Sequence, residues 1–189
     1  IHCANPIIAL LFAGALVQAG PPAAITVTVS PTAYTLRVTQ TKTFSASVAN
    51  TSTRTVTWAV NGVVGGNATV GTISTAGLYT APATVPVPNV VKIRATSTVS
   101  PNPFGEAEMT LQNPEPSLTS VTPNAVNIGT FTIQLVGKGF LPTSKIMLGG
   151  QAVATTFVSD TALKATLTDT TARDTTIAVA NPDPGGKTT

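Results

Sequence analysis

Short segments in which apolar and polar residues alternate recur along most of the chain. In one of them Val91, Ile93 and Ala95 alternate with Lys92 and Arg94. A period of two puts one side-chain face in a core and the other in water, which predicts β-strands. The 15 glycines and 15 prolines separate these segments as turn residues. Strands that recur roughly every ten residues are typical of two packed sheets. We therefore predict an all-β chain.

The alternating segments fall into two groups, which predict two β-sandwich modules. The first module is expected over residues 25–112 and the second over residues 117–189. Residues 113–116 (NPEP) carry two prolines, which predict a short, stiff linker between them. Residues 1–24 precede the first module as a segment of different composition, ending in a short proline-containing linker.

The longest apolar run of the chain spans residues 6–19 and ends in Val17, Gln18 and Ala19. It is shorter than the ~20 residues that span a bilayer, and small residues close it, as in a secretory signal peptide. We predict export, with a secreted or cell-surface location and no membrane span in the mature part. A short helix or an incomplete membrane anchor are the alternatives. Neither Met nor a basic leader precedes the run, which indicates a fragment. Cys3, the single cysteine, stands before the run, so a lipoprotein signal is not indicated and no intrachain disulfide can form.

The first module contains a run of motifs at residues 57–62 (TWAVNG), 70–73 (VGTI) and 76–82 (AGLYTAP). This run resembles the group-2 bacterial Ig-like (Big) domain family. The resemblance implies an immunoglobulin-like sandwich of a bacterial surface or secreted protein and brings no catalytic residues with it. Trp58, the only tryptophan, lies in the middle of an alternating segment. We interpret it as a core anchor, the alternative being an exposed platform on which a sugar stacks.

The second module contains SVTP at 120–123, GKGFLP at 137–142, TTFVSDTALKA at 155–165 and VANPDPGG at 179–186. Together these resemble the IPT/TIG domain family, which implies a second immunoglobulin-like fold. The resemblance also implies one more strand after the Gly-rich turn, so the module is expected to be truncated at its last strand. Gly137 and Gly139 lack the further glycine and the Lys-Ser/Thr pair of a phosphate loop and predict a tight bend instead.

The charge of the chain does not alter the prediction of two β-sandwich modules. Charged residues make up 9% of the chain and the net charge is +3. The basic residues are scattered rather than gathered in a stripe, which argues against nucleic-acid binding. They are Arg37, Lys42, Arg54, Lys92, Arg94, Lys138, Lys145, Lys164, Arg173 and Lys187.

The sequence offers no catalytic set. The only histidine, His2, lies in the predicted signal segment, so neither a Ser–His–Asp nor a Cys–His arrangement is expected in the mature chain. Glu106 and Glu108 share one side of a predicted strand and could form part of a calcium site. A solvated strand face is the favoured interpretation. We predict no catalytic, cofactor-binding or metal-binding residues and no cofactor.

These features predict a non-catalytic structural, spacer or adhesion module of a secreted or cell-surface bacterial protein. The alternative is a pair of accessory modules that bind carbohydrate or protein for a larger extracellular enzyme. Surface carbohydrate, protein and further domains of the same chain are the expected partners. Tyr79, Phe104 and the loop at residues 62–67 are the first candidates for a binding surface. DNA binding, suggested by transcription-factor relatives of the second module, is disfavoured by the export signal and the scattered charge.

Overall fold

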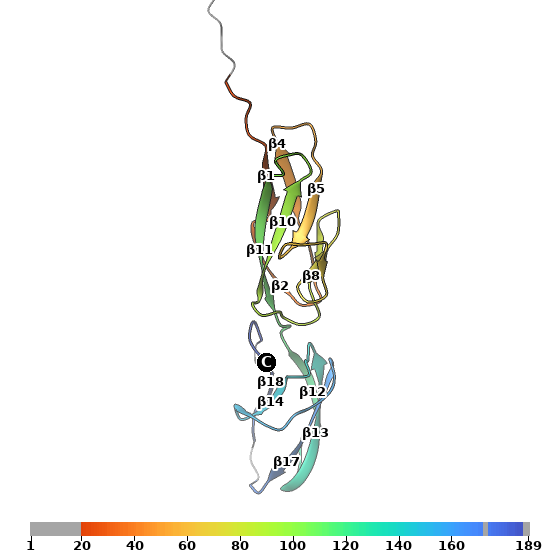
Figure 1. Cartoon of the computed structure of the whole chain (residues 1–189). Helices are drawn as coiled ribbons and strands as arrows, with labels where there is room; N and C mark the ends of the chain where they lie inside the picture. Colours follow the sequence, from red (N-terminus) through yellow and green to blue (C-terminus); the bar gives the residue numbers. More distant parts are fainter. Residues whose placement is uncertain (1–19, 172–173, 187–189) are drawn as a thin grey trace, which may run out of the picture.

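The computed structural model describes residues 20–171 and 174–186. The predicted apolar core of the signal, at residues 6–19, therefore lies outside the described residues, as do His2 and Cys3. The described residues form strands and turns without a helix, which confirms the all-β prediction. Two modules follow one another along the molecule, with strands β1–β11 in the first and β12–β18 in the second (Figure 1).

The first module is a sandwich of two layers. One layer is a five-stranded sheet with the strand order β2-β11-β10-β5-β6, in which β2 runs parallel to β11. The other layer consists of the pair β1-β4 and the four-stranded sheet β3-β9-β8-β7. The strands are β1 (Thr26–Ser30), β2 (Ala33–Arg37), β3 (Thr41–Thr43), β4 (Ser45–Ala49), β5 (Val56–Val60), β6 (Val63–Val64), β7 (Gly66–Asn67), β8 (Gly71–Ile73), β9 (Leu78–Thr80), β10 (Val90–Ser97) and β11 (Phe104–Gln112).

The core of the first module is built by the inward residues of the alternating segments. In β10, Val91, Ile93 and Ala95 are each fully buried, as the period of two predicts. Phe44 separates β3 from β4, is buried, and donates its backbone N–H to the Gly77 carbonyl at 2.8 Å, so it links the two parts of its layer. The buried residues of this core are Val27, Val29, Leu36, Phe44, Val48, Trp58, Val60, Ile73, Tyr79, Ala81, Val91, Ile93, Ala95, Ala107, Met109 and Leu111.

Trp58 is only 6% exposed and belongs to the core of the first module. Its six-membered ring lies where a side chain at Gly77 would have to go, 3.2 Å from the Cβ position of that residue. The core-anchor interpretation of Trp58 is therefore confirmed, and a sugar-stacking platform at this residue is not available.

The second module has two facing sheets, ordered β12-β13-β17-β16 and β15-β14-β18. Its strands are β12 (Ser117–Thr122), β13 (Gly129–Lys138), β14 (Lys145–Leu148), β15 (Gln151–Ala152), β16 (Thr156–Ser159), β17 (Ala162–Asp169) and β18 (Ile177–Ala180). Its core consists of Ile133, Leu135, Phe140, Ile146, Leu163, Ala165 and Val179. Both modules thus fit the predicted immunoglobulin-like sandwich architecture.

The glycine pair of the second module shapes a bend, as the sequence predicts. Gly137 lies in β13, where the Ser117 carbonyl and the Phe140 ring occupy the space of a side chain. Gly139 has a φ of 71°, a left-handed conformation that glycine adopts at little cost. Its Cβ position would be 2.7 Å from the Glu115 carbonyl oxygen, so the bend lets the linker pass close by.

Replacing Trp58 with Ala should unfold the first module or lower its stability by about 3–5 kcal/mol, because the change leaves a large cavity among packed side chains. Circular dichroism during thermal unfolding measures the loss. Phe104→Ala is the matched control, since the Phe104 ring is 52% exposed and its removal should shift the midpoint little. An unchanged melt for Trp58→Ala would contradict the core assignment.

Candidate functional site

Tyr79 was predicted as a candidate binding residue, and the structure shows this prediction to be wrong. Its side chain is fully buried in the core of the first module. The Tyr79 hydroxyl donates a 2.7 Å hydrogen bond to the Val70 carbonyl, which satisfies the polar end of the ring inside the sandwich. A ligand could reach it only by opening the core, so Tyr79 is a structural residue.

Phe104 is exposed, but one side of its ring already has a partner. The guanidinium of Arg94 lies 4.1 Å from the ring centroid, a cation–π contact. Arg94 in turn forms a 2.7 Å ion pair with Glu106, and Lys92 lies 3.7 Å from the same carboxylate. Glu106 is therefore part of a paired, solvated strand face, which is the favoured interpretation of the Glu106 and Glu108 pattern.

The loop at residues 62–67 forms the two short strands β6 and β7. Val64 is 71% exposed here and Val63 is 44% exposed. Asn67 closes the loop, because its side-chain oxygen accepts bonds from the backbone N–H groups of Thr69 (2.9 Å) and Val70 (3.1 Å). The loop is thus ordered and presents a small apolar surface.

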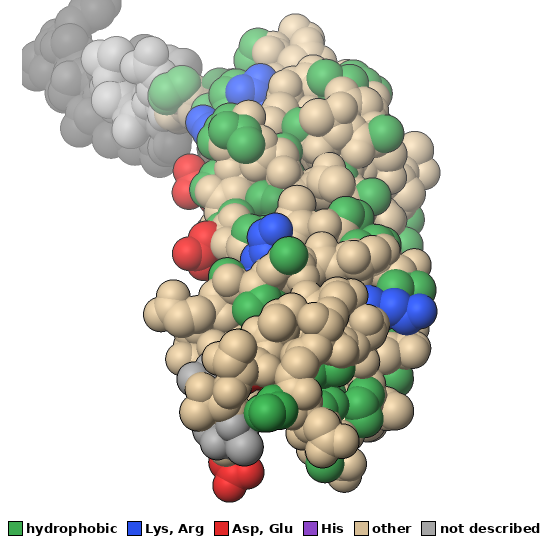
Figure 2. All heavy atoms as spheres, turned by 90° about the horizontal axis from the view of Figure 1, so that it is seen from below, with side chains coloured by type: hydrophobic (Ala, Val, Ile, Leu, Met, Phe, Trp, Pro, Cys, Tyr) green, Lys and Arg blue, Asp and Glu red, His purple; other side chains and the backbone are tan. Residues whose placement is uncertain are grey.

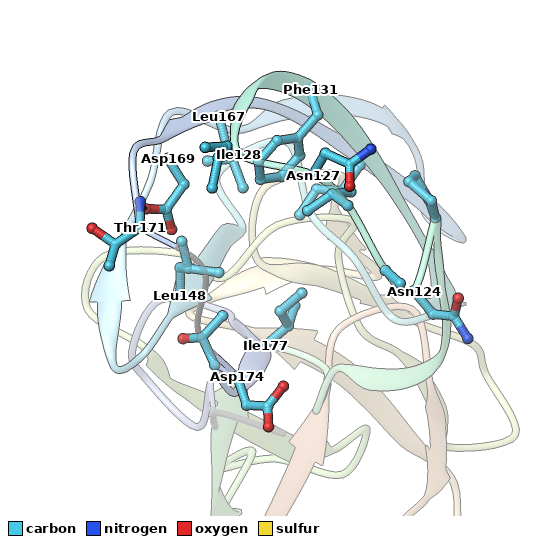
Figure 3. Close-up of a pocket in the computed structure, with 15 residues that line it drawn as sticks. Asn124, Asn127, Ile128, Phe131, Leu148, Leu167, Asp169, Thr171, Asp174 and Ile177 are labelled. Atoms are coloured by element: carbon cyan, nitrogen blue, oxygen red, sulfur yellow. Dashed lines mark hydrogen bonds between the residues drawn. The ribbon is translucent and has the colours of Figure 1, made fainter.

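A groove of about 550 Å³ opens between the two sheets of the second module, at the end away from the first module (Figure 3). Apolar side chains line it from both sheets, Phe131 and Leu167 on one and Leu148 and Ile177 on the other. Polar side chains such as Asn124, Asn127 and Asp174 make up the rest of its lining. Asp169 lies at its rim and accepts a 3.0 Å hydrogen bond from the Thr171 backbone. Within residues 20–171 and 174–186, no three His, Cys, Asp or Glu side chains come close enough together to hold a metal ion.

The face that ends the second module also shows no gathering of charge. Seen along the molecule from that end, Lys, Arg, Asp and Glu side chains are few and separated (Figure 2). The surface between them is mostly uncharged. Most of the long-range side-chain contacts that involve charged groups and backbone carbonyls lie instead at the joint between the modules.

Arg37 is the centre of that joint. It is the last residue of β2 and pairs in register with Gln112 at the end of β11, so its backbone belongs to the first module. Its guanidinium reaches into the joint, donating to the backbone carbonyls of Asn113 and, at 3.3 Å, Gly185. It also forms a 2.6 Å ion pair with Glu115. One side chain thus connects the first module, the linker and the last turn of the second module.

Asn113 adds two further bonds to the same turn. Its backbone N–H donates to the Pro184 carbonyl at 2.8 Å, and its side-chain amide donates to the Pro182 carbonyl at 3.0 Å. Gly185 packs against Gln112, whose side chain lies 2.7 Å from the Cβ position of the glycine. Three backbone carbonyls of the turn at residues 182–185 therefore accept bonds from Arg37 and Asn113.

Asn181 ties the linker to the second module from the other side. Its side-chain amide donates to the carbonyls of Pro114 (2.8 Å) and Gly139 (2.7 Å). Its side-chain oxygen accepts a 2.5 Å bond from the Ser144 hydroxyl. Asn181 is 6% exposed, so its hydrogen-bonding capacity is used inside the protein. Three residues of the predicted linker at residues 113–116 are thus bonded by side chains of the modules, Asn113 and Glu115 by Arg37 and Pro114 by Asn181.

A second groove, of about 750 Å³, lies beside the joint. One wall is the loop at residues 83–89 of the first module and the other is formed by residues 141–143 and 182–184 of the second. Asn113 contributes to this groove and to the Arg37 contacts. Sequence reasoning missed the joint, because Arg37 stood among the scattered charges. The available signal was its place beside an apolar strand residue, Leu36, at the end of an alternating segment.

Comparison with known families supports the family resemblance of the second module. Residues 116–189 match the IPT/TIG domain family, which confirms the resemblance predicted from the motifs of this part of the chain. The resemblance of residues 25–112 to the group-2 bacterial Ig-like family finds no such support and stays a prediction. No curated protein shows significant similarity to the chain. Among the described residues, no helix has the length and apolar character needed to cross a membrane.

Burial raises the pKa of Tyr79 from 10.0 to about 12. A folded-state pKa above the unfolded value means that the neutral phenol stabilises the fold fully below pH 10, and that this contribution is lost as the pH rises through 12. In a Tyr34→Phe variant Tyr79 is the only tyrosine. Its phenolate absorbance should appear near pH 12, together with loss of folded structure.

Tyr79→Phe is the companion variant. It should lose about 1–2 kcal/mol at neutral pH, because the Val70 carbonyl is left without its donor. It should also be less sensitive to alkaline pH than the parent protein. Titration of Tyr79 near pH 10 in the folded state would show that the ring is accessible to water.

Proposed function

We propose that the two modules form a non-catalytic, rigid spacer of a secreted or cell-surface bacterial protein, which holds further domains of the same chain at a fixed distance. The observation that carries this proposal is the joint. Arg37 and Asn113 together bond three carbonyls of the turn at residues 182–185, and Asn181 bonds the linker. A joint bonded on both sides of the linker resists bending, as a spacer requires.

The end-to-end arrangement of the modules supports the same role. Strands of both modules run roughly along the long direction of the molecule (Figure 1). Arg37 reaches the linker and the turn from the end of a strand, so its position follows the sheet rather than a flexible loop. The scarcity of charge and the location of the only histidine at His2 favour a structural role over catalysis.

A binding role is the second candidate, and one observation favours it. Val64 is 71% exposed and Val63 44% exposed on an ordered loop at the edge of a sheet. An exposed apolar surface at such a place suits a protein or carbohydrate ligand. Binding on a glycan array that is lost in a Val63→Ser, Val64→Ser double variant would support this role. A blank array with the parent protein would exclude the carbohydrate form of it.

Rigidity can be measured between two spin labels, one in each module. Ser47 in β4 and Gln134 in β13 are exposed, and replacing both by cysteine in a Cys3→Ser background gives a single labelled pair. Double electron–electron resonance should give a narrow distribution of the distance between the two labels in the protein that is otherwise unchanged. Arg37→Ala should broaden it, because the turn and the linker lose their shared donor.

Arg94→Ala is the matched control for this measurement. Arg94 also forms a carboxylate pair, at 2.7 Å, but within the first module, so the variant should keep the narrow distribution. A broad distribution in the parent protein would contradict the rigid-spacer proposal. An equal effect of both arginine variants would show that the joint is not the cause.

A further inference from the structure

We propose that Arg37 and Asn113 make the two modules unfold as one cooperative unit, so that the first module stabilises the second. The inference concerns the joint on which the proposed function rests, but it is a statement about folding stability. Modules could be aligned rigidly and still unfold independently. The two proposals therefore fail in different ways.

The two modules differ in the cores that support them. Among the described residues the first core contains 16 buried members and the second contains 7. Four large apolar side chains of the second module, Phe131, Leu148, Leu167 and Ile177, line the open groove instead of being fully enclosed. Because burial of apolar surface is the main stabilising contribution, the second module is the weaker one by itself.

The joint holds one end of a strand whose other end lines the open groove. β18 (Ile177–Ala180) is an edge strand with β14 as its only neighbour in the described sheet. Val179 in this strand is fully buried in the second core. The turn at residues 182–185 follows β18 almost directly, and its carbonyls are bonded to Arg37 and Asn113. Detachment of β18 from the core would therefore disrupt the hydrogen bonds of this turn to Arg37 and Asn113.

The first module also loses hydrogen bonds when the second module unfolds. The side-chain partners of Arg37 are the Asn113 and Gly185 carbonyls and the Glu115 carboxylate, all at or beyond the linker. Val38, the next residue, donates its backbone N–H to the Gln112 carbonyl at 2.9 Å, which fixes Arg37 beside the end of β11. Unfolding of the second module removes Gly185 from this set. Each module therefore loses bonds when the other unfolds, which is the condition for coupling.

The chain provides a reporter for one module alone. Trp58 is its only tryptophan and lies in the first core. Trp58 fluorescence therefore follows the first module, whereas circular dichroism follows the strands of both. Coincident thermal transitions by the two methods are expected for the parent protein, as for a single cooperative unit.

The decisive variant is Leu135→Ala, a cavity in the second core far from the reporter. In the coupled protein it should lower the midpoint of the Trp58 transition by about 5–15 °C, together with the circular-dichroism transition. In an Arg37→Ala background the same change should leave the Trp58 midpoint in place and split off an earlier transition seen by circular dichroism. An Arg94→Ala background is the matched control and should keep the coupling.

The outcomes separate cleanly. If Leu135→Ala lowers only the circular-dichroism transition and leaves the Trp58 midpoint unmoved with the joint intact, the coupling proposal is overturned. The same holds if coupling persists undiminished in Arg37→Ala combined with Asn113→Ala. Should Leu135→Ala prevent folding of the second module altogether, Ile133→Val gives a milder change at another buried position of the same core, with a proportionally smaller shift expected.

Discussion

The guanidinium of Arg37 is the interaction on which the arrangement of the two modules depends. A planar fork with several N–H donors can bond acceptors that lie in different directions, which a lysine ammonium on a flexible stem does less well. Arg37 uses this geometry to hold the linker carbonyl of Asn113, the turn carbonyl of Gly185 and the carboxylate of Glu115. These polar contacts connect the second module to the first.

Much of the fold could be predicted because the physical rule behind it is local. A residue that faces the core of a sandwich must be apolar, and its neighbours in a strand face the opposite way. Val91, Ile93 and Ala95 obey this rule and are fully buried. Trp58 could be assigned to the core for the same reason, since apolar residues flank it at a spacing of two.

The rule fails where strands are short or contacts are distant. In the three-residue strand β9, both Leu78 and Tyr79 are large and apolar in part, and alternation cannot decide which of them faces inward. The structure buries Tyr79 and leaves Leu78 43% exposed, so an apparent binding residue is a core residue. The joint was unpredictable for a related reason. Arg37 and Gly185 are 148 positions apart, and nothing local to either shows that they meet.

The joint combines a few polar contacts with an apolar groove beside them. Charged residues make up only 9% of the chain. Two of its arginines form ion pairs, Arg94 with Glu106 on a sheet face and Arg37 with Glu115 at the joint. Backbone carbonyls accept the hydrogen bonds of Arg37 and Asn113, and water can replace such bonds when the joint opens. The groove beside the joint adds apolar residues of both modules, among them Val85 and Leu141. In the proposed spacer, these contacts align the two modules and couple their unfolding.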